Sequence, residues 1–213
     1  MGERIGVLIV DDHVVIAEGL SVLISADREL EVTGIAHTAA EGLRLAAETA
    51  PRVVLLDHYL PDRTGVEITA QVKEMVPGAA VVILTSHDDD DVLASAFAAG
   101  VSGFLLKTQA AERVIDGIKT AAAGEMLISA TTLTRVLRRP RRAARVVGPP
   151  MDLTPRERDV LRLIAEGMDS RTIAAESGLT VATVRTYVQT ILRKLGAHSR
   201  LQAVMRGQEF GLL

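Results

Sequence analysis

Short apolar runs recur through the first part of the chain, and segments with apolar residues every three or four positions lie between them. Most runs are rich in Val, Ile and Leu without polar alternation, which is typical of parallel strands buried on both faces. Strands alternating with helices of this length predict an α/β fold, a doubly wound (βα)5 parallel sheet. The predicted strands are Ile5–Val10, Leu30–Ile35, Val53–Leu56, Ala80–Thr85 and Gly103–Leu106.

From Thr154 onward the pattern is helical, and each predicted helix is preceded by a residue that can cap it. Thr154 with Glu157 forms a capping box, and Ser199 with Gln202 forms a second one before the final helix. Ser170 and Thr180 can cap two helices between these boxes. This part therefore predicts a small all-α domain of four helices.

The two middle helices have the spacing of a helix-turn-helix. Ala174 is small enough to let the helices approach, Gly178 permits a positive backbone angle in the turn, and Val184 can anchor the second helix on the core. Because a small residue followed by glycine is common by chance, this spacing alone is a weak signal. It gains weight from the flanking segments 153–167 and 183–200 and the family resemblance that they carry.

A proline- and arginine-rich segment separates the two parts. Leu133–Val147 holds six arginines around Pro140, and Gly148-Pro149-Pro150 follows. Proline and glycine disfavour regular structure and favour a boundary. We therefore expect a first domain over residues 1–124, an Arg-rich linker over 125–150 and a helical domain over 151–213. The arginines are interpreted as a solvated tether, with DNA phosphate contact as the less favoured reading.

Charge is divided unevenly between these parts. Residues 1–124 carry 9 Lys and Arg against 19 Asp and Glu, whereas residues 125–213 carry 15 against 8. An acidic front and a basic back indicate that only the back half meets a polyanion such as DNA.

Composition narrows the chemistry. Apolar residues make up 48% of the chain, enough for a packed core, and cysteine is absent, which excludes disulfides and zinc–thiolate sites. Its histidines are scattered, so no zinc or catalytic histidine site is expected. No run of about 18 apolar residues occurs, and the apolar start ends at Asp11 and Asp12, so neither a membrane span nor a signal peptide is expected. We expect a cytoplasmic protein.

Polar residues follow four of the predicted strands at the same end. Asp11 and Asp12 follow the first strand, Asp57 follows the third, Thr85 ends the fourth and Lys107 follows the fifth. Ligands of open parallel sheets bind outside the carboxyl ends of the strands. These five side chains are therefore expected to converge at one edge of the sheet.

Three carboxylates at one edge predict a bound cation, because without one they would raise one another's pKa. Oxygen ligands suit Mg²⁺, which keeps water ligands and accepts a phosphoryl oxygen. Lys107 and Thr85 can hold a phosphoryl group, and a carboxylate can act as a nucleophile that forms an acyl phosphate. The sequence therefore predicts a phosphoryl-accepting pocket.

Four motifs resemble the receiver domain of two-component response regulators over about residues 4–122. They are V-D-D-H at 10–13, D-H-Y-L-P-D-R-T-G at 57–65, L-T-S at 84–86 and G-F-L-L-K at 103–107. The resemblance implies that Asp57 is the phosphoacceptor, that Asp12 binds Mg²⁺ directly and that Asp11 acts through water. It further implies a magnesium ligand from the backbone carbonyl of Tyr59, phosphoryl contacts from Thr85 and Lys107, and a switch rotamer at Phe104.

The back half resembles the LuxR-type DNA-binding domain of the NarL/FixJ subfamily of response regulators. The matching segments are L-T-P-R-E-R-D-V-L-R-L-I-A-E-G at 153–167 and T-V-R-T-Y-V-Q-T-I-L-R-K-L-G-A-H-S-R at 183–200. The resemblance implies a recognition helix over about 181–195 and a final helix, 200–209, that pairs two copies. It places base contacts at Arg185, Thr186 and Gln189, and phosphate contacts at Thr183, Arg171, Arg193 and Lys194.

Two residues depart from this subfamily's usual pattern. Thr172 stands where the family usually has Glu, and Tyr187 stands where His is common. These departures leave the fold intact and put the target base sequence in doubt.

Together the two resemblances imply a transcriptional regulator and not an enzyme. A sensor histidine kinase would phosphorylate Asp57, which would control homodimerisation and sequence-specific DNA binding. A phosphatase is disfavoured because Tyr59 stands where such enzymes place a second acid, and a small-molecule sensor would need an apolar cavity. A receiver that acts independently of phosphorylation stays open.

Overall fold

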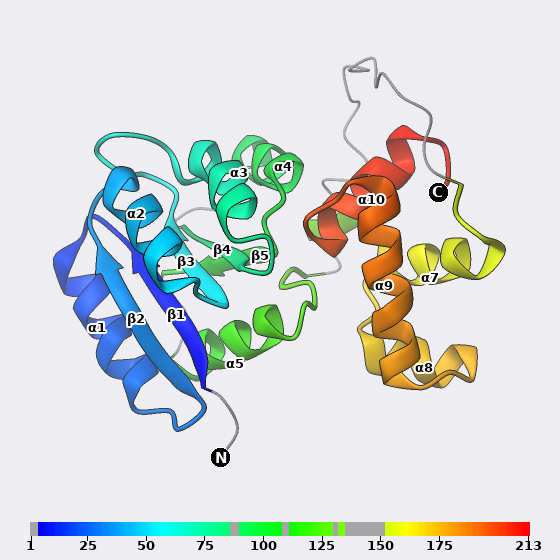
Figure 1. Ribbon diagram of the computed structural model, residues 1–213, viewed down its shortest axis with the longest axis horizontal. Coiled ribbons are helices and arrows are strands. Elements are labelled where there is room, and N and C mark those ends of the chain that lie inside the picture. Colours follow the sequence, from blue (N-terminus) through cyan, green and yellow to red (C-terminus); the bar gives the residue numbers. More distant parts are fainter. Residues whose placement is uncertain (1–3, 86–89, 108–110, 130–131, 135–151) are drawn as a thin grey trace. The chain divides into compact units, whose positions relative to one another are not determined.

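The computed structural model describes residues 4–85, 90–107, 111–129, 132–134 and 152–213 (Figure 1). The chain divides into two compact units, Met1–Leu127 and Ile128–Leu213. The arginines expected in the linker lie outside the described residues. Within the described ranges, no helix is both long enough and apolar enough to cross a bilayer.

The first unit is a five-stranded parallel sheet with strand order β2-β1-β3-β4-β5. This arrangement confirms the predicted α/β fold. The strands are β1 (Ile5–Val10), β2 (Leu30–Ala36), β3 (Val53–Asp57), β4 (Ala80–Thr85) and β5 (Gly103–Leu106). The helices are α1 (Val14–Ser25), α2 (Ala39–Thr49), α3 (Gly65–Met75), α4 (Asp90–Ala99) and α5 (Ala111–Ala122).

Helices cover both faces of the sheet (Figure 1). On one face, Ala17 of α1 and Ile118 of α5 share a fully buried core with Val7, Leu55 and Val82 of three central strands. The other face packs against α2, α3 and α4. Burial on both faces explains why the central strands read as continuous apolar runs.

Strand register aligns the carboxyl ends of the central strands. Val10 of β1 pairs with Leu56 of β3, so Asp11 and Asp57 leave neighbouring strands at the same level. Thr85 of β4 pairs with Leu106 of β5, which places Lys107 at the next position along the same edge. This register creates the site described below.

Over the described residues 152–213, the second unit has four helices: α7 (Pro155–Ala165), α8 (Ser170–Ser177), α9 (Val181–Leu195) and α10 (Arg200–Glu209). The expected capping box at Thr154 and Glu157 is present, with both reciprocal hydrogen bonds formed. The cap of α8 differs from expectation. Asp169 caps this helix, and its carboxylate accepts a hydrogen bond from the Thr172 N–H at 2.8 Å. Ser170 is buried and accepts a hydrogen bond from Arg200 instead.

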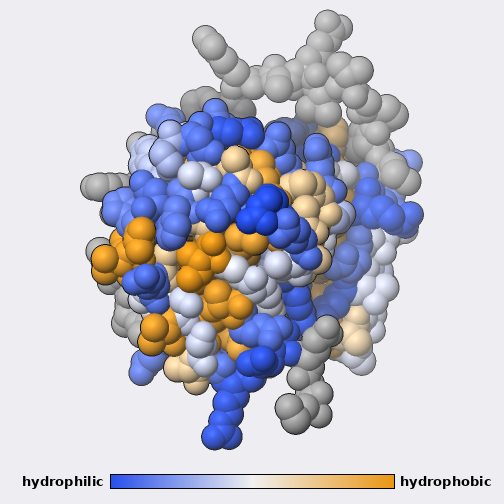
Figure 2. All heavy atoms as spheres, turned by 60° about the vertical axis from the view of Figure 1, so that its left-hand side comes forward, coloured by the Kyte–Doolittle hydropathy of each residue, from blue (hydrophilic) through white to orange (hydrophobic). Residues whose placement is uncertain are grey.

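The surface carries apolar side chains on one helix of the first unit. Val14, Val15 and Val22 of α1 are 49%, 83% and 74% exposed. Figure 2 shows apolar side chains among charged ones on the side of the molecule that lies at the left in Figure 1.

Another helix of the first unit carries a buried charged side chain. Lys73 of α3 is 2% exposed and donates a hydrogen bond to the Ala79 carbonyl at 2.6 Å.

Gly65 tests how tightly the fold packs around Asp57. A Cβ at this position would meet the backbone carbonyl of Asp57 and lie 3.1 Å from Leu56 Cγ. We expect Gly65→Ala to lower the free energy of unfolding by about 1–3 kcal/mol, because the backbone must shift. Urea denaturation measures the effect. Gly78→Ala is the control, since a Cβ there meets nothing within 4 Å, and an equal loss in both variants would contradict the steric explanation.

Candidate functional site

Three charged side chains meet at the carboxyl edge of the sheet. Lys107 Nζ lies 2.8 Å from Asp11 Oδ2 and 2.8 Å from Asp57 Oδ2. Asp11 is fully buried and Asp57 is 3% exposed. The ends of β1, β3 and β5 therefore bring together an acidic pair and one cation, as the strand-end pattern led us to expect.

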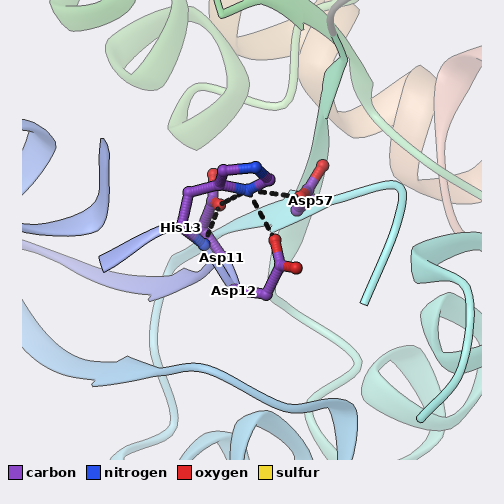
Figure 3. Close-up of side chains that lie close together, drawn as sticks. All are labelled: Asp11, Asp12, His13 and Asp57. Carbon is purple, nitrogen blue, oxygen red and sulfur yellow. Dashed lines mark hydrogen bonds and ion pairs between the residues drawn. The ribbon is translucent and has the colours of Figure 1, made fainter. Parts of the chain in front are cut away.

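Asp12 and His13 extend this cluster toward solvent. His13 Nδ1 lies 2.6 Å from Asp12 Oδ1, 3.3 Å from Asp11 Oδ1 and 4.0 Å from Asp57 Oδ2 (Figure 3). One ligand atom from each of these four residues lies within 4.8 Å of the others. The pocket can therefore offer several oxygen ligands to one cation. Sequence reasoning treated the histidines as scattered and missed His13, although it directly follows the Asp pair.

The electrostatics of the pocket follow from burial and pairing. Burial raises the pKa of Asp57 above its ordinary value, and the hydrogen bond from Lys107 opposes this increase. Burial lowers the pKa of Lys107, but its pairing with Asp11 and Asp57 outweighs burial and raises that pKa overall. Lys107 therefore stays charged near neutral pH beside a carboxylate whose charge is costly. Such a carboxylate can act as a nucleophile toward an electrophilic group that the Lys107 ammonium holds.

The remaining predicted pocket residues lie at or near the same edge. Thr85 is 7% exposed, and its carbonyl accepts a hydrogen bond from the Lys107 N–H at 2.9 Å. The ring of Phe104 is half-buried and makes an edge contact with Phe97 of α4, with ring centroids 5.2 Å apart. Tyr59 is 66% exposed, and its backbone forms a bridge with Thr64. The roles of Thr85, Phe104 and the Tyr59 carbonyl stay predictions.

Two further residues tie the surroundings of the pocket to the start of α2. Asp62 accepts hydrogen bonds from the N–H groups of Ala39 at 2.8 Å and Ala40 at 3.0 Å. The ring Nδ1 of His37 lies 2.9 Å from the Asp11 carbonyl. Sequence reasoning missed both residues, since each partner is more than twenty positions away in the chain and no local pattern marks it.

Helix α9, the predicted recognition helix, has an apolar and a polar side. Val184, Val188, Ile191 and Leu195 are buried, and most of the predicted DNA contacts lie opposite them. Arg185, Thr186, Gln189 and Arg193 of α9 and Arg171 of α8 are exposed, whereas Thr183 is half-buried. Their assignment to bases or phosphates stays a prediction.

Lys194 differs from the other predicted DNA contacts. Its Nζ lies 2.7 Å from Glu157 Oε2 and 3.1 Å from the Asp152 carbonyl, and the side chain is 17% exposed. The lysine therefore ties the end of α9 to the start of α7. A phosphate would have to compete with Glu157 for this ammonium, so we interpret Lys194 as a structural residue first.

Comparisons with known proteins cover both units. Residues 7–119 match the response regulator receiver domain, and residues 151–206 match the luxR family of bacterial regulatory proteins. The transcriptional regulatory protein LiaR of Bacillus subtilis is 36% identical over 201 residues, which cover 94% of this chain and 95% of LiaR. The response regulator protein VraR of Staphylococcus aureus is 34% identical, with 98% and 99% covered.

A solved structure is similar to part of this chain. A two-component response regulator of the LuxR family from Aurantimonas sp. SI85-9A1 is 29% identical to this chain, with a TM-score of 0.58. The match covers 63% of this chain and 96% of that structure.

The pair formed by Glu157 and Lys194 generates a stability prediction. Burial raises the pKa of Glu157, but the bonds from Lys194 and Thr154 outweigh it and lower that pKa below the ordinary 4.5. A lowered carboxyl pKa gives stability that is present above the unfolded pKa and is lost as the pH falls through the folded value. We expect Lys194→Met to cost about 1 kcal/mol at pH 7, and less under acid conditions.

Urea denaturation at pH 7 and at pH 3 measures this difference. Arg162→Met is the control, because Arg162 lies 3.6 Å from Asp159 with both side chains more than half exposed. This variant is expected to change stability by less than about 0.5 kcal/mol. A Lys194→Met loss that stays constant between the two pH values would exclude the ion pair as its cause.

Proposed function

This chain belongs to the two-component response regulators that join a receiver domain to a LuxR-type DNA-binding domain, and we propose that phosphorylation of Asp57 by a sensor histidine kinase controls its dimerisation and DNA binding. The contact of Lys107 Nζ with both Asp11 and Asp57 at 2.8 Å carries this proposal. Such a lysine can neutralise one oxygen of a phosphoryl group that arrives on Asp57. Transcription is the regulated process, as the family's DNA-binding domain indicates.

We assign the receiver to residues 1–124, the linker to 125–150 and the DNA-binding domain to 151–213. The division between compact units after Leu127 supports the first boundary approximately. The two family matches, which end at residue 119 and begin at residue 151, support a linker between them. Because its target is DNA, we place the protein in the cytoplasm.

The acidic cluster fits a divalent cation, for which Mg²⁺ is the proposed ion. Asp12, Asp57 and the backbone carbonyl of Tyr59 would bind it directly, and Asp11 would act through water. The close approach of ligand atoms from Asp11, Asp12 and Asp57 supports this assignment. Bound Mg²⁺ would supply neutralising charge and a coordination position for a phosphoryl oxygen. His13, whose side chain is 62% exposed, would have to leave Asp12 when that carboxylate becomes a ligand.

Residues of the chain account for the phosphoryl transfer. A carboxylate oxygen of Asp57 attacks the phosphorus of the kinase phosphohistidine, an O–P bond forms, and the N–P bond to the histidine breaks. Lys107 balances the charge of the new acyl phosphate, and the Thr85 hydroxyl donates a hydrogen bond to one of its oxygens.

The switch then passes from the pocket to the face formed by α4, β5 and α5. Thr85 and Lys107 move toward the phosphoryl group, and Phe104 changes rotamer. The edge contact between Phe104 and Phe97 supports this path from the pocket to the face, because it joins β5 to α4. Nearly complete switching requires about 5.5 kcal/mol of differential stabilisation between the two states.

For DNA binding, we propose that Arg185, Thr186 and Gln189 read base edges, since arginine can bind guanine and glutamine can bind adenine through two hydrogen bonds. Thr183, Arg171 and Arg193 would contact phosphates, and Lys194 would do so only by giving up Glu157. Exposure of Arg185 and Gln189 opposite the buried face of α9 supports this assignment.

We further propose that α10 pairs two copies, each on one DNA half-site. This helix packs against α7 and α9. Its buried residues are Arg200, Leu201, Gln202, Ala203, Val204, Met205 and Gly207. Pairing through these buried residues would require them to become exposed, whereas Gln208 and Glu209 are already exposed.

Asp57→Asn tests the phosphorylation step, because an amide keeps the shape of the carboxylate and is not a nucleophile. Acetyl phosphate with Mg²⁺ should phosphorylate the unmodified chain, and mass spectrometry should find no phosphate on the variant. Treatment should raise the DNA affinity of the unmodified chain about tenfold or more, a coupling free energy within the usual range, and leave that of the variant unchanged. Equal affinity of the untreated and treated unmodified chain would favour a phosphorylation-independent regulator.

Arg185→Ala and Arg193→Ala should separate base reading from phosphate binding. Arg185→Ala should cost about 1–3 kcal/mol on the preferred site and little on unrelated DNA. Arg193→Ala should weaken both by a similar factor and reduce the salt slope by about 1. Fluorescence anisotropy over a range of salt concentrations measures both effects. Indistinguishable site preference in Arg185→Ala and the unmodified protein would remove Arg185 from the base contacts.

A further inference from the structure

The start of α2 receives its cap from a distant loop. Asp62 lies between β3 and α3, and its two carboxylate oxygens accept the N–H groups of Ala39 at 2.8 Å and Ala40 at 3.0 Å. The third N–H of the helix, from Glu41, bonds to the Thr38 hydroxyl at 3.2 Å. The N–H groups of this first turn, which have no partner within the helix, thus bond partly to Thr38 and partly to Asp62.

Charge favours the contact of Asp62 with α2. The positive end of the helix dipole lies at this terminus and attracts a carboxylate. The hydrogen bond from Ala39, joined by that from Ala40, accordingly holds the pKa of Asp62 below its ordinary value, although burial opposes them. Asp62 therefore stays ionised and attached to α2 across the neutral range.

The same helix start is also tied to the opposite side of the pocket. The ring of His37 lies 2.9 Å from the Asp11 carbonyl, and since a carbonyl only accepts, Nδ1 carries the hydrogen. The backbone N–H of His37 donates to Glu41 Oε2 at 3.1 Å in the first turn of α2. A continuous set of polar contacts therefore runs from the Asp11 backbone through the start of α2 to Asp62.

The loop held by Asp62 is the one that leaves the proposed phosphoacceptor. At its base, the His58 N–H donates to the Leu84 carbonyl at 3.1 Å, and the Gly65 N–H donates to the His58 carbonyl at 2.9 Å. Asp62 fixes the loop farther out, three residues beyond Tyr59. The loop is thus fastened both at its base and beyond Tyr59.

We propose that Asp62 and His37 are positioning residues which, through the start of α2, hold the loop 58–64 and the Asp11–Asp12 segment at the spacing that Mg²⁺ binding requires. The inference rests on the proposed function. Ligands that are already in place lose less conformational freedom when the cation binds, so the affinity is higher. Loss of such supporting contacts typically costs 10- to 100-fold in metal affinity.

Asp62→Ala in the full-length chain is the main test. We expect the Mg²⁺ concentration that gives half-maximal phosphorylation by acetyl phosphate to rise about tenfold. The rate at saturating Mg²⁺ should stay close to that of the unmodified chain, because Asp57 and Lys107 are intact. Isothermal titration calorimetry with Mg²⁺ alone should show the same loss of affinity. The Mg²⁺ requirement of Asp62→Asn, which keeps one acceptor oxygen, should lie between those of the unmodified chain and Asp62→Ala.

Thr38→Ala is the matched control. It removes the local cap of the same helix but leaves both bonds to Asp62, so it should lower thermal stability without changing the Mg²⁺ requirement. His37→Phe, which keeps a ring but lacks the donor, should raise the requirement as Asp62→Ala does. An equal rise in Thr38→Ala would reduce the effect to helix stability and overturn the proposal, as would an unchanged requirement in Asp62→Ala.

The experiments distinguish failure of the proposed function from failure of the positioning role. If the unmodified chain is not phosphorylated on Asp57 at any Mg²⁺ concentration, the proposed function fails. If it is phosphorylated and the Asp62 and His37 variants match it at every Mg²⁺ concentration, only the positioning role is overturned.

Discussion

Two carboxylates buried side by side are unfavourable unless a cation accompanies them, and this constraint organises the first unit. Asp11 and Asp57 are almost fully enclosed, and Lys107 supplies the compensating charge from a third strand. Removing one member of a buried charged group leaves the others uncompensated, at a cost of several kcal/mol. The three side chains are therefore energetically coupled, which suits the proposed change of charge at Asp57.

The sheet supplies this geometry without special local structure. Parallel strands in register deliver their last residues to one edge, and the cores on both faces keep the strands in place. Gly65 shows how little room remains, since even a methyl group there would meet the Asp57 carbonyl. In the second unit, the buried face of α9 likewise leaves Arg185 and Gln189 exposed on the opposite side. In both units, apolar packing fixes the backbone and thereby the placement of the polar residues.

Sequence reasoning succeeded where the signal was periodic and failed where it depended on contacts between distant residues. Buried strands, capped helices and residues at strand ends leave local patterns, and these predicted the α/β sheet, the four helices and the meeting of Asp11, Asp57 and Lys107. Asp62 and His37 leave no such pattern, because their partners are set by the fold. The local pattern places the cap of α8 one residue late, because Asp169 and Ser170 are both good caps and the contact of Ser170 with Arg200 depends on the fold.

Lys73 provides the chain with a natural reporter of local opening. Burial lowers the pKa of this lysine to about 8. The packed end of α3 nevertheless shields it from reagents. Acylation of Lys73 would therefore require this helix end to separate from the sheet, much as amide exchange requires local unfolding. Reaction of Lys73 would thus report the motion of α3, the helix that begins just after the loop that follows Asp57.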